Sequence, residues 1–118
     1  MKTVLGKYKH FDISLQQLKG VLGEDLYNVT KVRPEKVFAA DVVYAIEQYL
    51  AKAVTLPELV DWVNVVWFTE LYEYASREEN AIASVMTLLE TLDEGAEFSD
   101  AEYAKMIACL EANKACEL

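Results

Sequence analysis

Four segments of the chain share a spacing that marks the start of a helix. Each has Ser or Thr followed three positions later by Glu or Gln, which is the pattern of a capping box, where each side chain accepts a hydrogen bond from the other residue's backbone amide. The pairs are Ser14 with Gln17, Thr55 with Glu58, Ser76 with Glu79, and Ser99 with Glu102. Because apolar residues at helical spacing follow each pair, the sequence predicts an all-α fold.

The stretch 55–74 is the most apolar part of the chain and holds both tryptophans, Trp62 and Trp67. Pro57 falls in the first turn, where its missing N–H costs no helical bond. Apolar residues cover most of the helix circumference, which is typical of a buried helix. Residues 63–68 also fit a buried strand, but the cap and the length favour a helix. We predict a compact bundle of about five helices around a central helix at about 55–74.

The other helices are expected at 14–22, 34–52, 76–93 and 99–113, with Pro34 at a first helical position and Gly23 and Gly95 as C-terminal stops. Residues 1–11 fit a short strand or an extended N-terminal arm. Whether residues 1–10 and 25–32 pair as strands stays open, because a two-stranded ribbon is marginal alone. We expect one domain over 1–118, with a basic N-terminal segment at 1–33 and the main helical bundle at 34–113.

The net charge of −9 is unevenly distributed along the 118 residues. Residues 1–36 carry seven basic and four acidic groups, whereas residues 37–118 carry four basic and sixteen acidic groups, so the two parts have net charges of +3 and −12. A strongly acidic body repels nucleic acid and anionic membranes, so neither is expected as a partner. It favours a basic protein partner, although solubility alone also explains such a charge.

The residue types that carry catalysis and metal binding are scarce. Cys109 and Cys116 stand two turns apart if they share one helix, too far for a disulfide, so free thiols in a reducing compartment are expected. The N-terminus has no apolar signal segment, so we expect a cytoplasmic protein. His10 is the one histidine and lies near no nucleophile motif. No zinc ligand set, phosphate loop or dinucleotide fingerprint is present, so the sequence predicts no catalytic, metal or cofactor site and no enzyme.

Two groups of residues are candidate sites. Aromatic rings among carboxylates suit a surface that receives a basic partner, and such a group stands at the end of the central helix. Its members are Glu70, Tyr72, Glu73, Tyr74, Glu78 and Glu79. The alternative is that the rings complete the core while the carboxylates keep the helix end soluble. Asp61 and Asn64 form a second group, expected to be buried polar residues that hydrogen-bond within the structure.

The segment TLPELVDWVN at residues 55–64, together with the acidic helices after it, resembles small helical bacterial immunity proteins of the colicin-immunity type. In these a T-x-x-E-L-x-x-W-A-N-like helix start precedes paired amphipathic helices. The likeness covers roughly residues 34–113, leaves out the basic N-terminal segment, and has Val63 where the family pattern prefers alanine. It implies a protein that blocks a toxin by binding it, and it assigns no binding residues.

The sequence therefore leads to two alternative predictions of function. The first is a non-enzymatic inhibitor, immunity or antitoxin-like, whose acidic surface masks a basic partner such as a nuclease toxin. The second is a structural or regulatory helical domain that acts as a homo-oligomer through apolar residues at 59–74. Neighbouring phage structural genes would favour a phage-encoded inhibitor or assembly factor.

Overall fold

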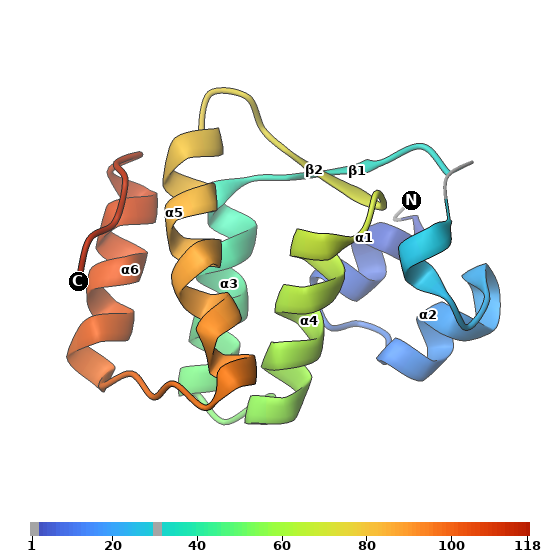
Figure 1. Cartoon of the computed structure of the whole chain (residues 1–118), viewed down its shortest axis with the longest axis horizontal. Coiled ribbons are helices and arrows are strands. Elements are labelled where there is room, and N and C mark those ends of the chain that lie inside the picture. Colours follow the sequence, from blue (N-terminus) through green and yellow to red (C-terminus); the bar gives the residue numbers. More distant parts are fainter. Residues whose placement is uncertain (1–2, 30–31) are drawn as a thin grey trace.

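Residues 3–29 and 32–118, which the computed structural model describes, form six α-helices, two 3-10 turns and one pair of short strands (Figure 1). In chain order these are α1 (Val4–Lys9), α2 (Leu15–Leu22), η1 (Leu26–Asn28), β1 (Glu35–Val37), α3 (Ala39–Leu50), α4 (Leu56–Phe68), β2 (Tyr72–Tyr74), α5 (Glu79–Leu89), η2 (Glu90–Glu94) and α6 (Asp100–Glu111). The predicted all-α bundle is confirmed, with a small parallel ribbon added. No described helix has the length and apolar content needed to cross a membrane.

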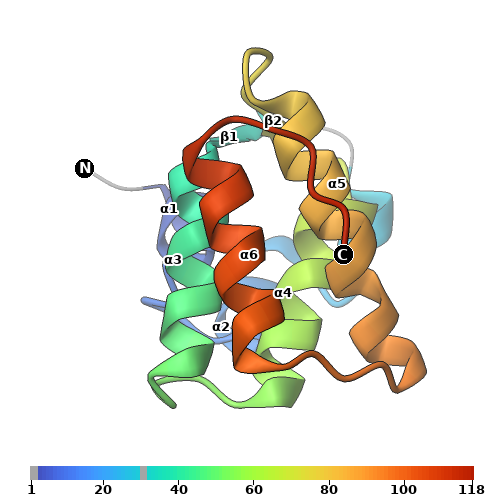
Figure 2. The ribbon, with the colours of Figure 1, turned by 90° about the vertical axis from the view of Figure 1, so that its left-hand side faces the viewer.

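The helix α4 stands between two groups of elements. Helices α1 and α2 lie on one side of it, and α3, α5 and α6 lie on the other, while β1 and β2 cross one end of the bundle (Figure 1). Turned by 90°, the molecule shows α6 running between α3 and α5 (Figure 2). The radius of gyration of 13.6 Å is that of a compact globule of this chain length.

The core is organised around α4, as the sequence predicted. The Thr55 side chain accepts from the Glu58 amide at 3.3 Å, and the Glu58 carboxylate accepts from the Thr55 amide at 2.8 Å. One full face of α4 is then buried, including Leu59, Trp62 and Val63. Burying a side chain of this size stabilises a fold by about 1.5–3 kcal/mol.

The predicted end of this helix at Tyr74 is wrong, because α4 stops at Phe68. Thr69 adopts an extended backbone, and its hydroxyl donates back to the Val65 carbonyl and accepts from the Leu71 amide. The chain then forms β2, where Tyr72 and Tyr74 point to the same face because side chains two apart in a strand share a side.

The predicted helix start at Pro34 is also wrong, because the residues after it form β1. Strand β1 pairs in parallel with β2, with Glu35 opposite Tyr72 and Val37 opposite Tyr74. Helix α3 begins at Ala39 instead, where the Asp41 carboxylate accepts from the Phe38 amide at 2.8 Å.

Three of the four predicted capping boxes form, at Ser14, Thr55 and Ser99. The box at Ser76 does not. Helix α5 begins at Glu79 after a turn in which the Glu78 amide donates to the Ala75 carbonyl. The Glu78 carboxylate is used elsewhere, because it accepts from the Ala39 amide at 3.1 Å and so caps the neighbouring helix α3. The sequence pattern cannot distinguish these uses, since both place an acid near a helix start.

The expected N-terminal extended arm is a helix. Thr3 accepts from the Gly6 amide at 3.0 Å and starts α1, which buries Leu5 and Tyr8. The proposed pairing of residues 1–10 with 25–32 does not occur within the described residues, since residues 4–9 are helical and 26–28 form η1. Residues 1–2 and 30–31 of that prediction lie outside the described part.

The two cysteines do not share a helix. The sequence argument that two helical turns separate them is therefore wrong. Cys109 lies on α6, whereas Cys116 lies on a C-terminal tail that turns back at Asn113 (Figure 2). Asn113 has a φ of 55°, and the Lys114 amide donates to the Cys109 carbonyl at 2.9 Å, which is a Schellman motif. Both thiols are free, their side chains are in contact, and Cys116 is buried in the core.

Candidate functional site

The predicted aromatic and acidic surface at residues 70–79 is only half present. Tyr72 is buried and donates to the Leu5 carbonyl at 2.6 Å, and Tyr74 is half-buried and stacks on Trp67. The rings therefore belong to the interior, and their assignment to a partner surface is wrong. Of the four carboxylates, those of Glu70, Glu73 and Glu79 are exposed and that of Glu78 caps α3.

The second predicted group, a buried Asp61 and Asn64, is also corrected. Asp61 is exposed, and Asn64 is half-buried and donates to the Asp93 carboxylate at 3.3 Å. With Glu58, they lie at three-residue intervals along one edge of α4. This edge is left uncovered because α2 packs beside it rather than over it, so the helix is less enclosed than its composition suggests.

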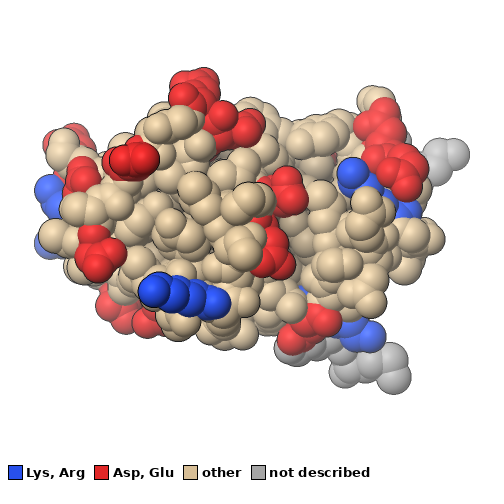
Figure 3. All heavy atoms as spheres, turned by 90° about the horizontal axis from the view of Figure 1, so that it is seen from below, with Lys and Arg blue, Asp and Glu red and all other residues tan. Residues whose placement is uncertain are grey.

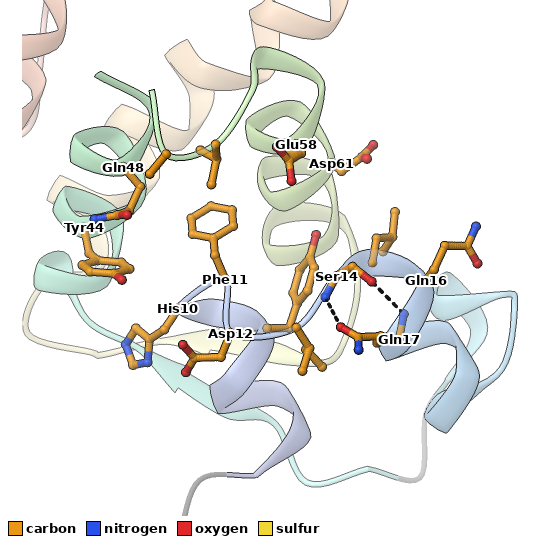
Figure 4. A pocket seen from close by; sticks show the side chains of 15 residues that line it. His10, Phe11, Asp12, Ser14, Gln16, Gln17, Tyr44, Gln48, Glu58 and Asp61 are labelled. Atoms are coloured by element: carbon orange, nitrogen blue, oxygen red, sulfur yellow. Dashed lines mark hydrogen bonds between the residues drawn. The ribbon is translucent and has the colours of Figure 1, made fainter. Parts of the chain in front are cut away.

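This uncovered edge borders a hollow with a volume of about 550 Å³, called the acidic hollow below. The residues that line it come from α1, the following turn, α2, α3, the 51–54 turn and α4. They are Tyr8, His10, Phe11, Asp12, Ile13, Ser14, Leu15, Gln16, Gln17, Tyr44, Gln48, Ala53, Val54, Glu58 and Asp61. Figure 4 shows Tyr44 and Gln48 on one side, Glu58 and Asp61 on the opposite side, and Phe11 between them.

The charge of the acidic hollow has one sign. Asp12, Glu58 and Asp61 contribute carboxylates, and none of the described lining residues is Lys or Arg. A neighbouring hollow of about 170 Å³ shares Asp61 but includes Lys19. Elsewhere the acidic groups are dispersed, as Figure 3 shows for the face seen from below, where they occur as separate groups in a mostly neutral surface. The acidic hollow therefore combines negative charge with a concave shape.

Two helix ends with non-glycine residues at positive φ shape this site. Phe11, at φ 62°, ends α1 and directs its ring onto Trp62, with the ring centroids 6.1 Å apart. Lys52, at φ 63°, ends α3 in the same way, where the Ala53 amide donates to the Gln48 carbonyl. A bulky residue in this backbone region is strained by about 1–3 kcal/mol, so the surrounding packing has to hold Phe11 in place.

A buried ionic network fastens this region to the rest of the fold. The Lys9 ammonium, almost fully buried, lies 3.0 Å from the Glu35 carboxylate and 3.2 Å from that of Asp41, and it donates to the Lys36 carbonyl. His10 Nε2 lies 2.9 Å from the other Asp41 oxygen. Asp41 therefore joins the end of α1 to the start of α3.

The sequence predicted that His10 lies in an extended arm, but the His10 side chain is held against α3. The Tyr44 ring meets the imidazole edge-on at 5.6 Å, and Nδ1 is buried without a hydrogen-bond partner among the described residues. A His–Asp pair serves catalysis when the second ring nitrogen activates a hydroxyl or thiol. In this arrangement no described nucleophile occupies that position.

Sequence patterns gave little sign of this site, because its members come from four helices and two turns. The nearest signal was Asp61, which stood out in the sequence as a polar residue on an apolar helix and which lines the hollow. Within the described residues no group of three or more His, Cys, Asp or Glu is placed to hold a metal ion. Comparison with protein-family models, curated proteins and solved structures finds no match to the chain.

Proposed function

We propose that the chain is a non-enzymatic, cytoplasmic inhibitor of the immunity or antitoxin kind, which binds a basic protein partner through the acidic hollow. The observation that carries the proposal is the lining of this hollow, in which Glu58 and Asp61 supply carboxylates and none of the described residues is Lys or Arg. Its volume of about 550 Å³ falls within the range of binding pockets. The net charge of −9 would draw a basic partner towards it.

The test is binding to a basic toxin encoded beside the gene, measured by calorimetry at several salt concentrations. Neutralising the hollow with Glu58→Gln and Asp61→Asn together should weaken binding at least tenfold and reduce its dependence on salt. The matched control is Glu70→Gln with Glu73→Gln, which removes the same charge from exposed positions outside the hollow. Equal losses from the two pairs would show that net charge, and not the hollow, directs binding.

A second candidate is a homo-oligomer, supported by Phe68, whose side chain is 52% exposed at the end of α4. The other large apolar side chains of residues 59–74 are buried or half-buried, which leaves this candidate a small surface. Sedimentation of the wild type and of Phe68→Asp tests it. A wild-type dimer that Phe68→Asp converts to a monomer would replace the first proposal.

A further inference from the structure

The acidic hollow is lined by a tyrosine, Tyr8, whose hydroxyl the fold does not use. Tyr8 is 3% exposed, lines the hollow, and makes no hydrogen bond from its hydroxyl to another described residue. Tyr72, which is buried to a similar degree, donates to the Leu5 carbonyl. The Tyr8 hydroxyl is not among the fully enclosed atoms that lack a partner, so it opens onto the hollow, where it is free to bond a ligand or water.

The surroundings of this hydroxyl are negative. Burial raises the pKa of Tyr8 above its usual value, and the nearby charges of Asp61 and Glu58 raise it further. The hydroxyl thus stays protonated and its oxygen lies close to two carboxylates of α4. Together these groups offer several acceptors and no positive charge.

His10 adds a second unused acceptor. When its Nε2–H donates to Asp41, Nδ1 of the neutral ring carries a lone pair, and this atom is buried and unpartnered among the described residues. His10 lines the same hollow as Tyr8. Nδ1 is enclosed by protein and belongs to the wall of the hollow, so the Tyr8 hydroxyl is the group of this pair that a ligand would contact.

The hollow also has aromatic walls. Phe11 projects into its centre and is backed by Trp62, with an angle of 29° between the ring planes (Figure 4). Tyr44 forms part of the opposite side. Aromatic faces attract cations, and a planar guanidinium can stack on a ring while its edges donate hydrogen bonds.

We propose that the acidic hollow holds the guanidinium of one arginine side chain presented by a protein partner. The inference rests on the proposed function and names the group that is bound. Guanidinium fits better than ammonium because its five donors in one plane can reach acceptors on α1 and α4 at once. An ammonium is compact, with three donors, and cannot span them in the same way.

The test compares three blocked peptides, acetyl-Gly-Gly-X-Gly-Gly-amide, in which X is arginine, lysine or citrulline. Citrulline keeps the shape of arginine without its charge. Binding is followed by backbone amide chemical shifts of the whole labelled protein. The arginine peptide should cause saturable shifts at Phe11, Tyr44, Gln48 and Ala53, with the lysine peptide at least several-fold weaker and the citrulline peptide without effect.

Variants then assign the contacts. Tyr8→Phe and Glu58→Gln should each weaken the arginine peptide on the order of tenfold, as expected for a hydrogen bond to a charged group. Glu70→Gln, outside the hollow, should leave it unchanged, and amide spectra of each variant establish that it is folded. Equal binding of arginine and lysine, or no loss in Tyr8→Phe, overturns the inference.

The outcome also separates this inference from the function on which it rests. If a basic toxin binds with salt dependence while the arginine peptide causes no shift in the hollow, the guanidinium site is wrong and the inhibitor proposal stands. If neither binds, both are overturned.

Discussion

The N-terminal helix α1 and the helices α3, α5 and α6 are held in the fold by different kinds of contact. The N-terminal helix α1 is held largely by polar bonds: the Lys9 network, the bond from the Trp62 indole to the Lys9 carbonyl at 3.0 Å, and the bond from Tyr72 to Leu5. The helices α3, α5 and α6 pack through apolar side chains that are almost wholly buried, such as Ile46, Ile82 and Met106. One region is positioned by directional contacts, and the other by close packing.

The difference indicates how this fold combines stability with a site. Apolar packing fills the space between helices at the density of a crystal and leaves no room for a hollow. Directional bonds hold α1 and its following turn at a fixed place while leaving the hollow beside them open. Four variants test this division, taken from the largest expected effect to the smallest.

Ile82→Ala, on α5, should lower the free energy of unfolding by about 2–5 kcal/mol, because it opens a cavity in a site with no exposed surface. Urea denaturation followed by tryptophan fluorescence measures the loss. Thr87→Ala, exposed on the same helix, is the control and should change stability by under about 0.5 kcal/mol. A small effect of Ile82→Ala would mean that the bundle is loosely packed.

Lys9→Met should cost about 2–3 kcal/mol, because Glu35 and Asp41 then face each other without a cation, although the partial exposure of Glu35 lessens the penalty. The loss should appear first as faster hydrogen exchange in α1, with α5 and α6 still protected. Lys7→Met, exposed on the same helix, serves as the control. Uniform loss of protection through all helices would contradict the proposed division.

Glu78→Ala should lower stability by about 1 kcal/mol, because the Ala39 amide at the start of α3 loses its acceptor. The adjacent Glu79→Ala removes an exposed carboxylate and should have a smaller effect. Thermal unfolding of both variants measures the difference. Identical melting temperatures would show that the hydrogen bond from the Ala39 amide to the Glu78 carboxylate does not contribute to stability.

The smallest effect concerns pH and the C-terminal tail. Burial and the neighbouring Cys109 raise the pKa of Cys116 from 9.0 to about 11. A thiol whose pKa is higher in the folded protein stabilises it fully below pH 9, and this stabilisation is lost as pH rises towards 11. The urea midpoint of the wild type should therefore fall more over this interval than that of Cys116→Val, which has no proton to lose.

Local signals in the sequence predicted the fold well. A capping box is formed within four residues, so the boxes at Thr55 and Ser99 could be identified without knowledge of the rest of the chain. The apolar face of α4 likewise follows from periodicity. The box at Ser76 failed because a turn occupies residues 75–78 and the helix begins only at Glu79, so Glu79 is the first helical residue and not the third.

Non-local contacts determined what the sequence did not predict. Residues 70–74 continue the apolar pattern of α4, yet they become a strand because β1 supplies its hydrogen-bond partners. The same pairing turns Tyr72 inwards and removes the predicted aromatic surface. Asp61 is exposed on α4, and the acidic hollow arises from four helices and two turns whose placement no local pattern encodes.

The bonds that hold α1 have a consequence for synthesis of the chain. They join residues 53 and 67 positions apart, through Trp62 to Lys9 and Tyr72 to Leu5. Helix α1 leaves the ribosome before its receptors α4 and β2, because both follow it in the chain. A helix of six residues is too short to be stable alone in the meantime. Helix α1 therefore docks after elements that are synthesised later than it, and the acidic hollow is complete only when α1 docks.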